Sequence, residues 1–494
     1  MAQAPPPPRQ GLISGVIVTL IAEGIALPAG LITAMVMTRG LGPETYGRFT
    51  VVATTLAITE WLLIAVLARA VVKFVAEADD WKPVAATSFR IYVAGGLGIG
   101  LAFWALAGTV ATLLGDPVLA DYFRLFAIQI PVFATGAASR NVLAGQGRYR
   151  QQAIASAVGW VGRVTFIVLF IELGFGIEGA ILGSICGTLS GSLTAVALVG
   201  PAIWGPARFP VRQLMQLALP AFLAMLFARL VDQIGLLAVQ VLATGEADVG
   251  YYGAAMNVFL LTGVIGAAVT PVLVSTVTAA RYRQDHGQVR QVSTDTVRFG
   301  LALLPLAAVA AGAADELAVL LFGAAFTAAA GPMAALIMAA VARAIAVMIS
   351  SVLIAVDRAW TAALIALPLP FICVAALIPV IPAYGAVGAA VVTMVVALLA
   401  TVASVWVLAV VVGTRPPTAT ILRSILLGAA AFLAAGAWPA AGWLVLIKVA
   451  VLSLAVLGVF VASGELTRTE LQLLLKAFSV RAGPPRGRPP AGPR

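Results

Sequence analysis

The sequence is poor in charged residues, histidine and cysteine. Of its 494 residues only 10% are charged, whereas 62% are hydrophobic and the mean hydropathy is +1.06. A soluble domain is about one quarter charged, so the composition excludes that class. Cys186 and Cys373 lie in separate apolar stretches and His286 has no acidic or cysteine cluster beside it, which argues against a disulfide framework or a metal site. The chain is therefore expected to lie in a lipid bilayer, with no cofactor.

Long apolar stretches occupy most of the chain. A helix needs roughly 20 predominantly apolar residues to cross about 30 Å of hydrocarbon. About fourteen such stretches fit between residues 11 and 462, the first two at 11–37 and 46–68. The first of these is too long for a cleaved signal peptide. The sequence predicts an all-α integral membrane protein with about 14 transmembrane helices.

Basic residues are concentrated in alternate connections between these stretches. The connections on one side hold only Arg39, Arg48 and Arg124, whereas those on the other side hold many more, among them Arg140 and Arg148. Basic connections stay in the cytoplasm, so we expect an even number of spans with both termini cytoplasmic. The net charge of +10 therefore reflects topology, and nucleic acid is not an expected partner.

Two short segments of the first half recur in the second half. The segment "LGPETYGRF" (41–49) resembles "TGEADVGYY" (244–252), so that Gly47 corresponds to Gly250. The segment "GIEGA" (176–180) resembles "GAVGA" (385–389) at nearly the same separation along the chain. Such self-similarity predicts a duplicated unit of six spans. Each unit has an even number of spans, so its two copies share one orientation in the membrane.

The duplication predicts how the chain is divided. We expect two six-helix lobes and a C-terminal helix pair between cytoplasmic ends: an N-terminal tail (1–10), an N-terminal lobe (11–200), a C-terminal lobe (201–412), the helix pair (413–462), and an amphipathic helix followed by a Pro- and Arg-rich tail (463–494).

Several motifs resemble those of a known family. They are "RGLGPETYGRF" (39–49), "ARAVVKFVAE" (68–77), "LAGQGRYR" (143–150), "VDQIGL" (231–236) and "VGYYGAA" (249–255). In this order they resemble bacterial polysaccharide flippases, which belong to the multidrug, oligosaccharidyl-lipid and polysaccharide exporter superfamily. The resemblance implies fourteen helices in two lobes, located in the bacterial cytoplasmic membrane.

Charged residues within the predicted spans are the candidate functional groups. A charge at the bilayer centre costs at least about 2.5 kcal/mol, so it usually faces the bundle interior or a wet cavity. The bases are Arg163, Arg229 and Arg343, and the acids are Glu23, Glu60 and Asp232. Arg229 and Asp232 lie one turn apart on one helix face and could simply neutralise each other. The position equivalent to Asp232 in the first half is Ala29, so any role of this acid belongs to the second lobe.

A cavity lined by the three arginines suits an anionic head group. Guanidinium groups stay protonated and bind phosphate oxygens in a fork. The resemblance implies a polyprenyl-diphosphate-linked oligosaccharide as substrate, flipped by alternating access for surface polysaccharide synthesis, such as that of lipopolysaccharide or exopolysaccharide. Polysaccharide polymerase machinery is then a further partner. Glu23, Glu60 and Asp232 either orient the arginines or take up a coupling H⁺ or Na⁺.

Three other functions are open alternatives. A multidrug or cation antiporter of the same superfamily would have a cavity of acids and aromatics, whereas the arginines favour an anion. A lipid II flippase would share the anionic substrate. A membrane glycosyltransferase, polymerase or ligase would need a catalytic cluster, and the sequence has neither a large outer loop nor an acidic or histidine cluster. We therefore expect a transporter and no enzymatic activity.

Other features have structural interpretations. Gly183, Gly187 and Gly191 recur every fourth residue and predict a face for close helix packing. Lys448 lies outside the repeated units, and its amine is expected to extend to the membrane surface.

Overall fold

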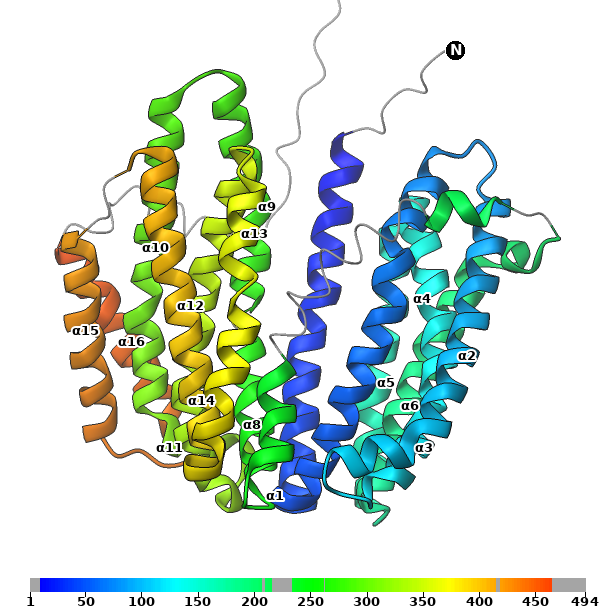
Figure 1. Cartoon of the computed structure of the whole chain (residues 1–494), viewed down its shortest axis with the longest axis horizontal. Coiled ribbons are helices and arrows are strands. Elements are labelled where there is room, and N and C mark those ends of the chain that lie inside the picture. The colour runs from blue at the N-terminus through cyan, green and yellow to red at the C-terminus, as the bar shows by residue number, and fades with distance from the viewer. Residues whose placement is uncertain (1–8, 207–208, 216–232, 262, 415–417, 464–494) are drawn as a thin grey trace, which may run out of the picture.

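The protein is a helical bundle. The computed structural model describes residues 9–206, 209–215, 233–261, 263–414 and 418–463, and within these ranges the regular structure is helical. Eight helices in the described part are long and apolar enough to cross a membrane. The predicted class, an all-α multi-pass membrane protein, is confirmed, whereas the count of fourteen spans stays a prediction. Figure 1 shows two groups of helices with the N-terminal arm of α1 between them.

The first group contains α1 to α6. Its elements are α1 (Arg9–Glu77), α2 (Lys82–Leu113), α3 (Leu119–Ala127), α4 (Gln129–Gly145), α5 (Tyr149–Glu172), α6 (Gly176–Val199) and the short 3₁₀ helix η1 (Pro201–Trp204). The first two predicted spans both lie in α1, which turns sharply at Gly42 (φ 75°, ψ 173°). A side chain would make this backbone conformation unfavourable, so glycine permits the turn.

The second group contains α8 to α16. Its elements are α8 (Asp248–Leu261), α9 (Gly263–Tyr282), α10 (His286–Gly312), α11 (Ala314–Phe322), the 3₁₀ helix η2 (Ala324–Ala329), α12 (Ala330–Ala355), α13 (Ala359–Ala366), α14 (Leu369–Val412), α15 (Thr418–Ala437) and α16 (Leu444–Ala462). Residues 233–242 are also helical. Like α1, α14 turns at a glycine, Gly385 (φ 53°, ψ −138°).

The turns of α1 and α14 lie at the same end of the bundle. A Cβ atom on Gly385 would overlap the carboxylate of Asp248, and one on Gly250 would overlap the carbonyl oxygen of Pro43. We call this end the outer end, following the orientation that the basic residues predict. That orientation stays a prediction.

Glycines also bring helices together within the first group. On α6, a Cβ at Gly183 would lie 2.6 Å from the backbone nitrogen of Ile167, and one at Gly191 would lie 2.9 Å from Cα of Gly159. One at Gly187 would overlap the backbone of Arg163. Contacts this short are sterically forbidden, so only glycine allows α5 and α6 to approach this closely. The predicted packing role of this stripe is confirmed.

The C-terminal helices α15 and α16 pack on α10, where Val309, Ala431, Val456 and Phe460 form a separate apolar cluster. Lys448 of α16 is fully buried, and its Nζ donates a hydrogen bond to Oε1 of Glu316 at 2.6 Å. The expectation that this amine extends to the membrane surface is therefore wrong, because an acid on α11 lies within its reach.

The predicted duplication has a local counterpart in the backbone. Gly176 and Gly385, which correspond in the two repeated segments, both have positive φ, at 59° and 53°. The proposed lobe boundaries at residues 200 and 412 stay predictions.

Candidate functional site

The first helix group contains a polar contact between Glu60 and Gln129. Glu60 lies in the second arm of α1, and its Oε1 accepts a hydrogen bond from Nε2 of Gln129 at 2.8 Å. Gln129 is buried and begins α4 just after the break at Ile128. Pro131 lies in the first turn of α4, where backbone N–H groups have no acceptor within the helix. A proline there therefore costs no helical hydrogen bond. The break between α3 and α4 therefore positions this amide against Glu60.

Arg163 lies on α5 close to the same acid. Arg163 and Glu60 attract each other electrostatically, and the guanidinium of Arg163 lies over the ring of Trp160, with its Cζ 5.7 Å from the ring centroid. Its Nε is buried and has no hydrogen-bond partner among the described residues. The backbone of α6 at Gly187 packs against the backbone of Arg163. The arginine is thus held by helix packing while donor capacity remains on its guanidinium.

Arg140 is a further member that the sequence interpretation assigned to a cytoplasmic connection. It lies instead within α4, about three helical turns after Gln129 and on the same face. Its guanidinium interacts electrostatically with Glu60, and its Cζ lies 5.7 Å from the ring centroid of Phe133. The sequence signal that could have placed Arg140 in this site is its spacing from Gln129 and Phe133, which puts all three on one helix face. We call Glu60, Gln129, Arg140 and Arg163 the first-lobe polar cluster.

A second polar contact extends from this cluster. Nδ2 of Asn141 donates a hydrogen bond to the hydroxyl of Tyr92 at 3.0 Å, which joins α4 to α2. Tyr92 is fully buried and interacts electrostatically with Arg140. The interior of the first group is therefore polar over several helices, which is unusual for a bundle that has lipid as its surroundings.

Arg343 lies in the second helix group, on α12. Its Cζ lies 4.6 Å from the ring centroid of Phe259 on α8, within the range of a cation–π interaction. Figure 1 shows α5 and α12 on opposite sides of α1. Arg163 and Arg343 therefore belong to different helix groups, and their predicted contribution to one shared cavity stays a prediction.

The remaining predicted site residues cannot be placed. Arg229 and Asp232 lie outside the described residues, and Glu23 lies in α1 outside the part whose side chains are described. Their roles stay predictions, including the choice between neutralisation and function for Arg229 and Asp232.

Several solved structures are similar to this chain. A lipid II flippase, MurJ, in an inward closed conformation has 15% sequence identity and a TM-score of 0.73, over 90% of this chain and 99% of that chain. An inward-facing multidrug resistance MATE family transporter of the MOP superfamily has 16% identity and a TM-score of 0.66, over 82% of this chain and 95% of that chain. A MOP superfamily transporter from Pyrococcus furiosus has 16% identity and a TM-score of 0.56, over 85% and 96%. The chain therefore has the fold of these transporters.

Sequence comparison identifies the family. No curated protein is significantly similar to the chain. The sequence model of the family described as "Polysaccharide biosynthesis protein" matches residues 36–331. This match covers more than half of the chain. It includes all four residues of the first-lobe polar cluster. The chain belongs to the polysaccharide biosynthesis protein family.

Proposed function

We infer that the protein flips a polyprenyl-diphosphate-linked oligosaccharide from the inner to the outer leaflet of the bacterial cytoplasmic membrane. The observation that carries this proposal is Arg163, a partly buried arginine whose Nε is buried and lacks a hydrogen-bond partner among the described residues. A guanidinium binds phosphate oxygens through two parallel hydrogen bonds and stays protonated in an apolar setting. Arg163 is suited to hold a diphosphate head group away from bulk water.

The neighbours of Arg163 support this role. Arg140 adds a second cation near Glu60, so the first-lobe polar cluster has two bases and one acid. The excess of positive charge favours an anionic ligand over a cationic drug. Family membership supports a role in polysaccharide synthesis, and the likeness to MOP superfamily transporters supports movement by alternating access.

Glu60 has an orienting role in this proposal. Its hydrogen bond from Gln129 at 2.8 Å fixes the carboxylate, and its attraction to Arg163 holds the guanidinium toward it. Uptake of H⁺ or Na⁺ by the same acid is the alternative role. Arg343, held over Phe259, would engage the substrate from the second lobe.

A lipid II flippase is the second candidate. The observation that favours it is the likeness of the fold to a lipid II flippase over 90% of this chain. Both candidates use Arg163 for an anionic head group, so the substrate assay must compare the two lipids directly.

The proposal is tested by replacing Arg163 in cells that make a surface polysaccharide. We expect Arg163→Ala to accumulate lipid-linked sugar in the inner leaflet, with little change in resistance to cationic dyes. Loss of this contact should weaken the affinity of the protein for the lipid-linked sugar roughly ten- to a hundredfold. Arg163→Lys should rescue only in part, because lysine keeps the charge but loses the planar fork.

A matched control is available in Arg124, which is exposed and bonds to Asp121 on the surface of α3 at 2.9 Å. Arg124→Ala should leave polysaccharide export unchanged. Intact export with lost dye resistance in Arg163→Ala would overturn the proposal in favour of an antiporter. Accumulation of lipid II with normal polysaccharide would instead select the second candidate.

A further inference from the structure

The two helix groups meet at the outer end through glycines of the repeated segments. A Cβ atom on Gly47 of α1 would lie 2.9 Å from the backbone nitrogen of Gly250 on α8, and one on Gly250 would overlap the carbonyl oxygen of Pro43. A Cβ atom on Gly253 would lie 2.8 Å from the methyl group of Thr50. Glycine is therefore required at each position for α1 and α8 to approach this closely. We call this contact of Pro43, Gly47 and Thr50 with Gly250 and Gly253 the glycine seam.

Buried side chains flank the glycine seam. The hydroxyl of Tyr46 accepts a hydrogen bond from Nδ2 of Asn257 at 2.9 Å, across from α1 to α8. The rings of Tyr46 and Tyr251 both meet the ring of Phe326 edge-on, with centroids 5.8 and 6.0 Å apart. Tyr46 and Phe326 are buried. The seam is therefore closed by packed aromatic groups as well as by backbone contact.

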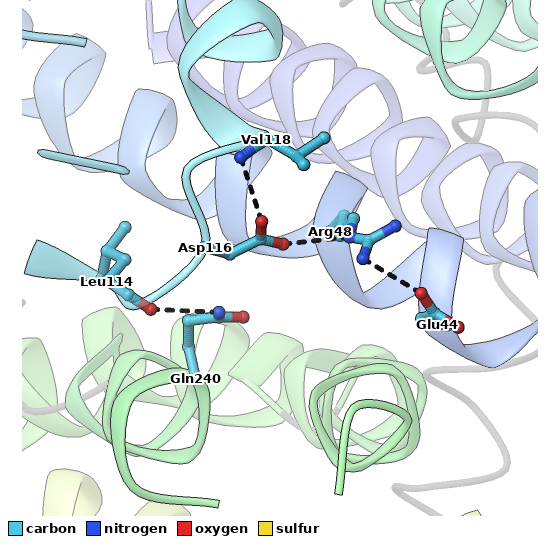
Figure 2. Close-up of polar contacts among 6 residues, drawn as sticks. All are labelled: Glu44, Arg48, Leu114, Asp116, Val118 and Gln240. Atoms are coloured by element: carbon cyan, nitrogen blue, oxygen red, sulfur yellow. Dashed lines mark hydrogen bonds and ion pairs between the residues drawn. The ribbon is translucent and has the colours of Figure 1, made fainter. Parts of the chain in front are cut away.

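Polar contacts at the rim also join the two groups. Nε2 of Gln240 donates a hydrogen bond to the carbonyl oxygen of Leu114 at 3.2 Å, as Figure 2 shows. Arg39 donates to the carbonyl oxygen of Leu320 at 2.6 Å. In Figure 2, Arg48 lies between Glu44 and Asp116, an arrangement that ties the α2–α3 connection to α1 within the first group.

The residues that meet at the seam correspond to each other in the repeated segments. Gly47 and Gly250 are equivalent positions of "LGPETYGRF" and "TGEADVGYY", and they are the glycines in closest contact across the two helices. Two equivalent residues touch each other only where an axis relating the two copies passes between them. The seam therefore lies close to the axis that relates the two copies, at the boundary between the two groups.

We propose that the glycine seam is the outer gate of the transporter. It is closed in this structure and seals the outer end, and its separation would open the space between the two groups to the outside. The backbone contacts at Gly47 and Gly250 can separate without rearrangement inside either group, whereas the contact of Tyr46 with Phe326 and its hydrogen bond from Asn257 must break. This assignment is independent of which substrate is carried.

The gate is tested by a single cysteine at position 254 in a chain in which Cys186 and Cys373 are replaced by alanine. Ala254 is fully buried and lies one turn after Gly250 on α8. We expect Gly253→Ala to raise the rate at which an impermeant maleimide labels this cysteine from outside at least tenfold. Adding Thr50→Ala should return the rate to that of the parent, because only the Cβ of residue 50 then remains, at 3.2 Å.

Two glycines outside the seam provide controls. A Cβ on Gly162 would lie 2.6 Å from Oγ of Ser190 within the first group, and one on Gly98 would meet nothing within 4 Å. Gly162→Ala and Gly98→Ala should leave labelling unchanged. Unchanged labelling in folded Gly253→Ala would overturn the proposal. So would raised labelling that Gly162→Ala reproduces or that Thr50→Ala fails to reverse, since either result indicates general loosening.

A disulfide tests the same gate in the opposite direction. The Cβ of Thr50 lies 3.2 Å from the Cβ position of residue 253, near the range of about 3.5–4.5 Å for disulfides. Oxidised Thr50→Cys/Gly253→Cys should stop transport, and the same variant should transport again after reduction, although not necessarily at the parental rate. Transport at the parental rate by fully cross-linked protein would overturn the gate. The labelling assay needs no substrate, so an error in the proposed function would leave its result intact.

Discussion

Nζ of Lys448 donates a hydrogen bond to Oε1 of Glu316 at 2.6 Å, which ties α16 to α11. The two partners differ in exposure: the Lys448 side chain has none, whereas that of Glu316 keeps 21%. The lysine therefore depends on its partner more than the acid does, because only the lysine would be left with a fully buried charge.

This asymmetry predicts unequal effects of single substitutions. Glu316→Leu should destabilise the fold by about 3–5 kcal/mol, since it leaves the ammonium group without a counter-ion. Lys448→Met should destabilise less, because Glu316 can reach solvent. The double variant should recover most of the loss. Thermal unfolding in detergent measures all three, and a double variant as unstable as Glu316→Leu would contradict the pairing.

A second prediction separates the two roles of Glu60. Glu60→Gln keeps an oxygen for the hydrogen bond from Gln129 but loses the charge that attracts Arg163, so an orienting role predicts that part of the transport survives. Glu60→Leu removes both the acceptor and the charge beside Arg163, and should lower transport about tenfold or more. Flipping rates in proteoliposomes provide the measurement.

The exposed acid Glu178, in the first turn of α6, is the matched control for this experiment. Glu178→Gln should transport like the parent. A coupling role for Glu60 predicts a different pattern, in which Glu60→Gln is as inactive as Glu60→Leu because neither side chain can take up an ion.

A third prediction concerns the support of Arg163 by α6. Gly187→Ala places a methyl group against the backbone of Arg163, so α5 and α6 must separate. We expect a loss of about 1–3 kcal/mol in stability, together with reduced export as Arg163 is displaced. Gly98→Ala is the control. The added Cβ would have no neighbouring atom within 4 Å. Alanine also favours the helix over glycine by about 1 kcal/mol. Equal melting temperatures for the two variants would refute the packing role.

A fourth prediction tests the orientation. Thr244 and Gln284 are both exposed, in connections that the basic residues assign to opposite sides of the membrane. In a chain lacking other cysteines, Thr244→Cys should react with an impermeant thiol reagent in intact cells. Gln284→Cys should react only after the membrane is permeabilised. The reverse pattern would invert the topology, and with it the side on which the glycine seam lies.

The membrane class and helix packing were predictable because their signals are local. Each span satisfies its backbone hydrogen bonds internally and must be apolar along its own length, so hydropathy identifies it. The spacing of Gly183, Gly187 and Gly191 predicted close packing because residues four apart share a helix face. The partner helix, α5, was not predictable from that spacing.

The polar cluster was only partly predictable. Glu60 and Arg163 were recognised as charges in apolar stretches, but Arg140 was not, because the apolar stretch ends before it while α4 continues to Gly145. Helix length depends on hydrogen bonding and packing as well as hydropathy. The contact between Gly47 and Gly250 was also not predictable, since it depends on how the two groups are arranged in one conformational state.

The make-up of the glycine seam has a consequence for ionic strength. Its central contacts are between uncharged backbone groups, whose attraction is short-ranged dispersion that dissolved salt does not screen. A guanidinium holding a phosphate, in contrast, is weakened by salt wherever water reaches it. The stability of the closed outer end should therefore be the same at low and high salt concentration. The affinity for an anionic head group should fall as the salt concentration rises.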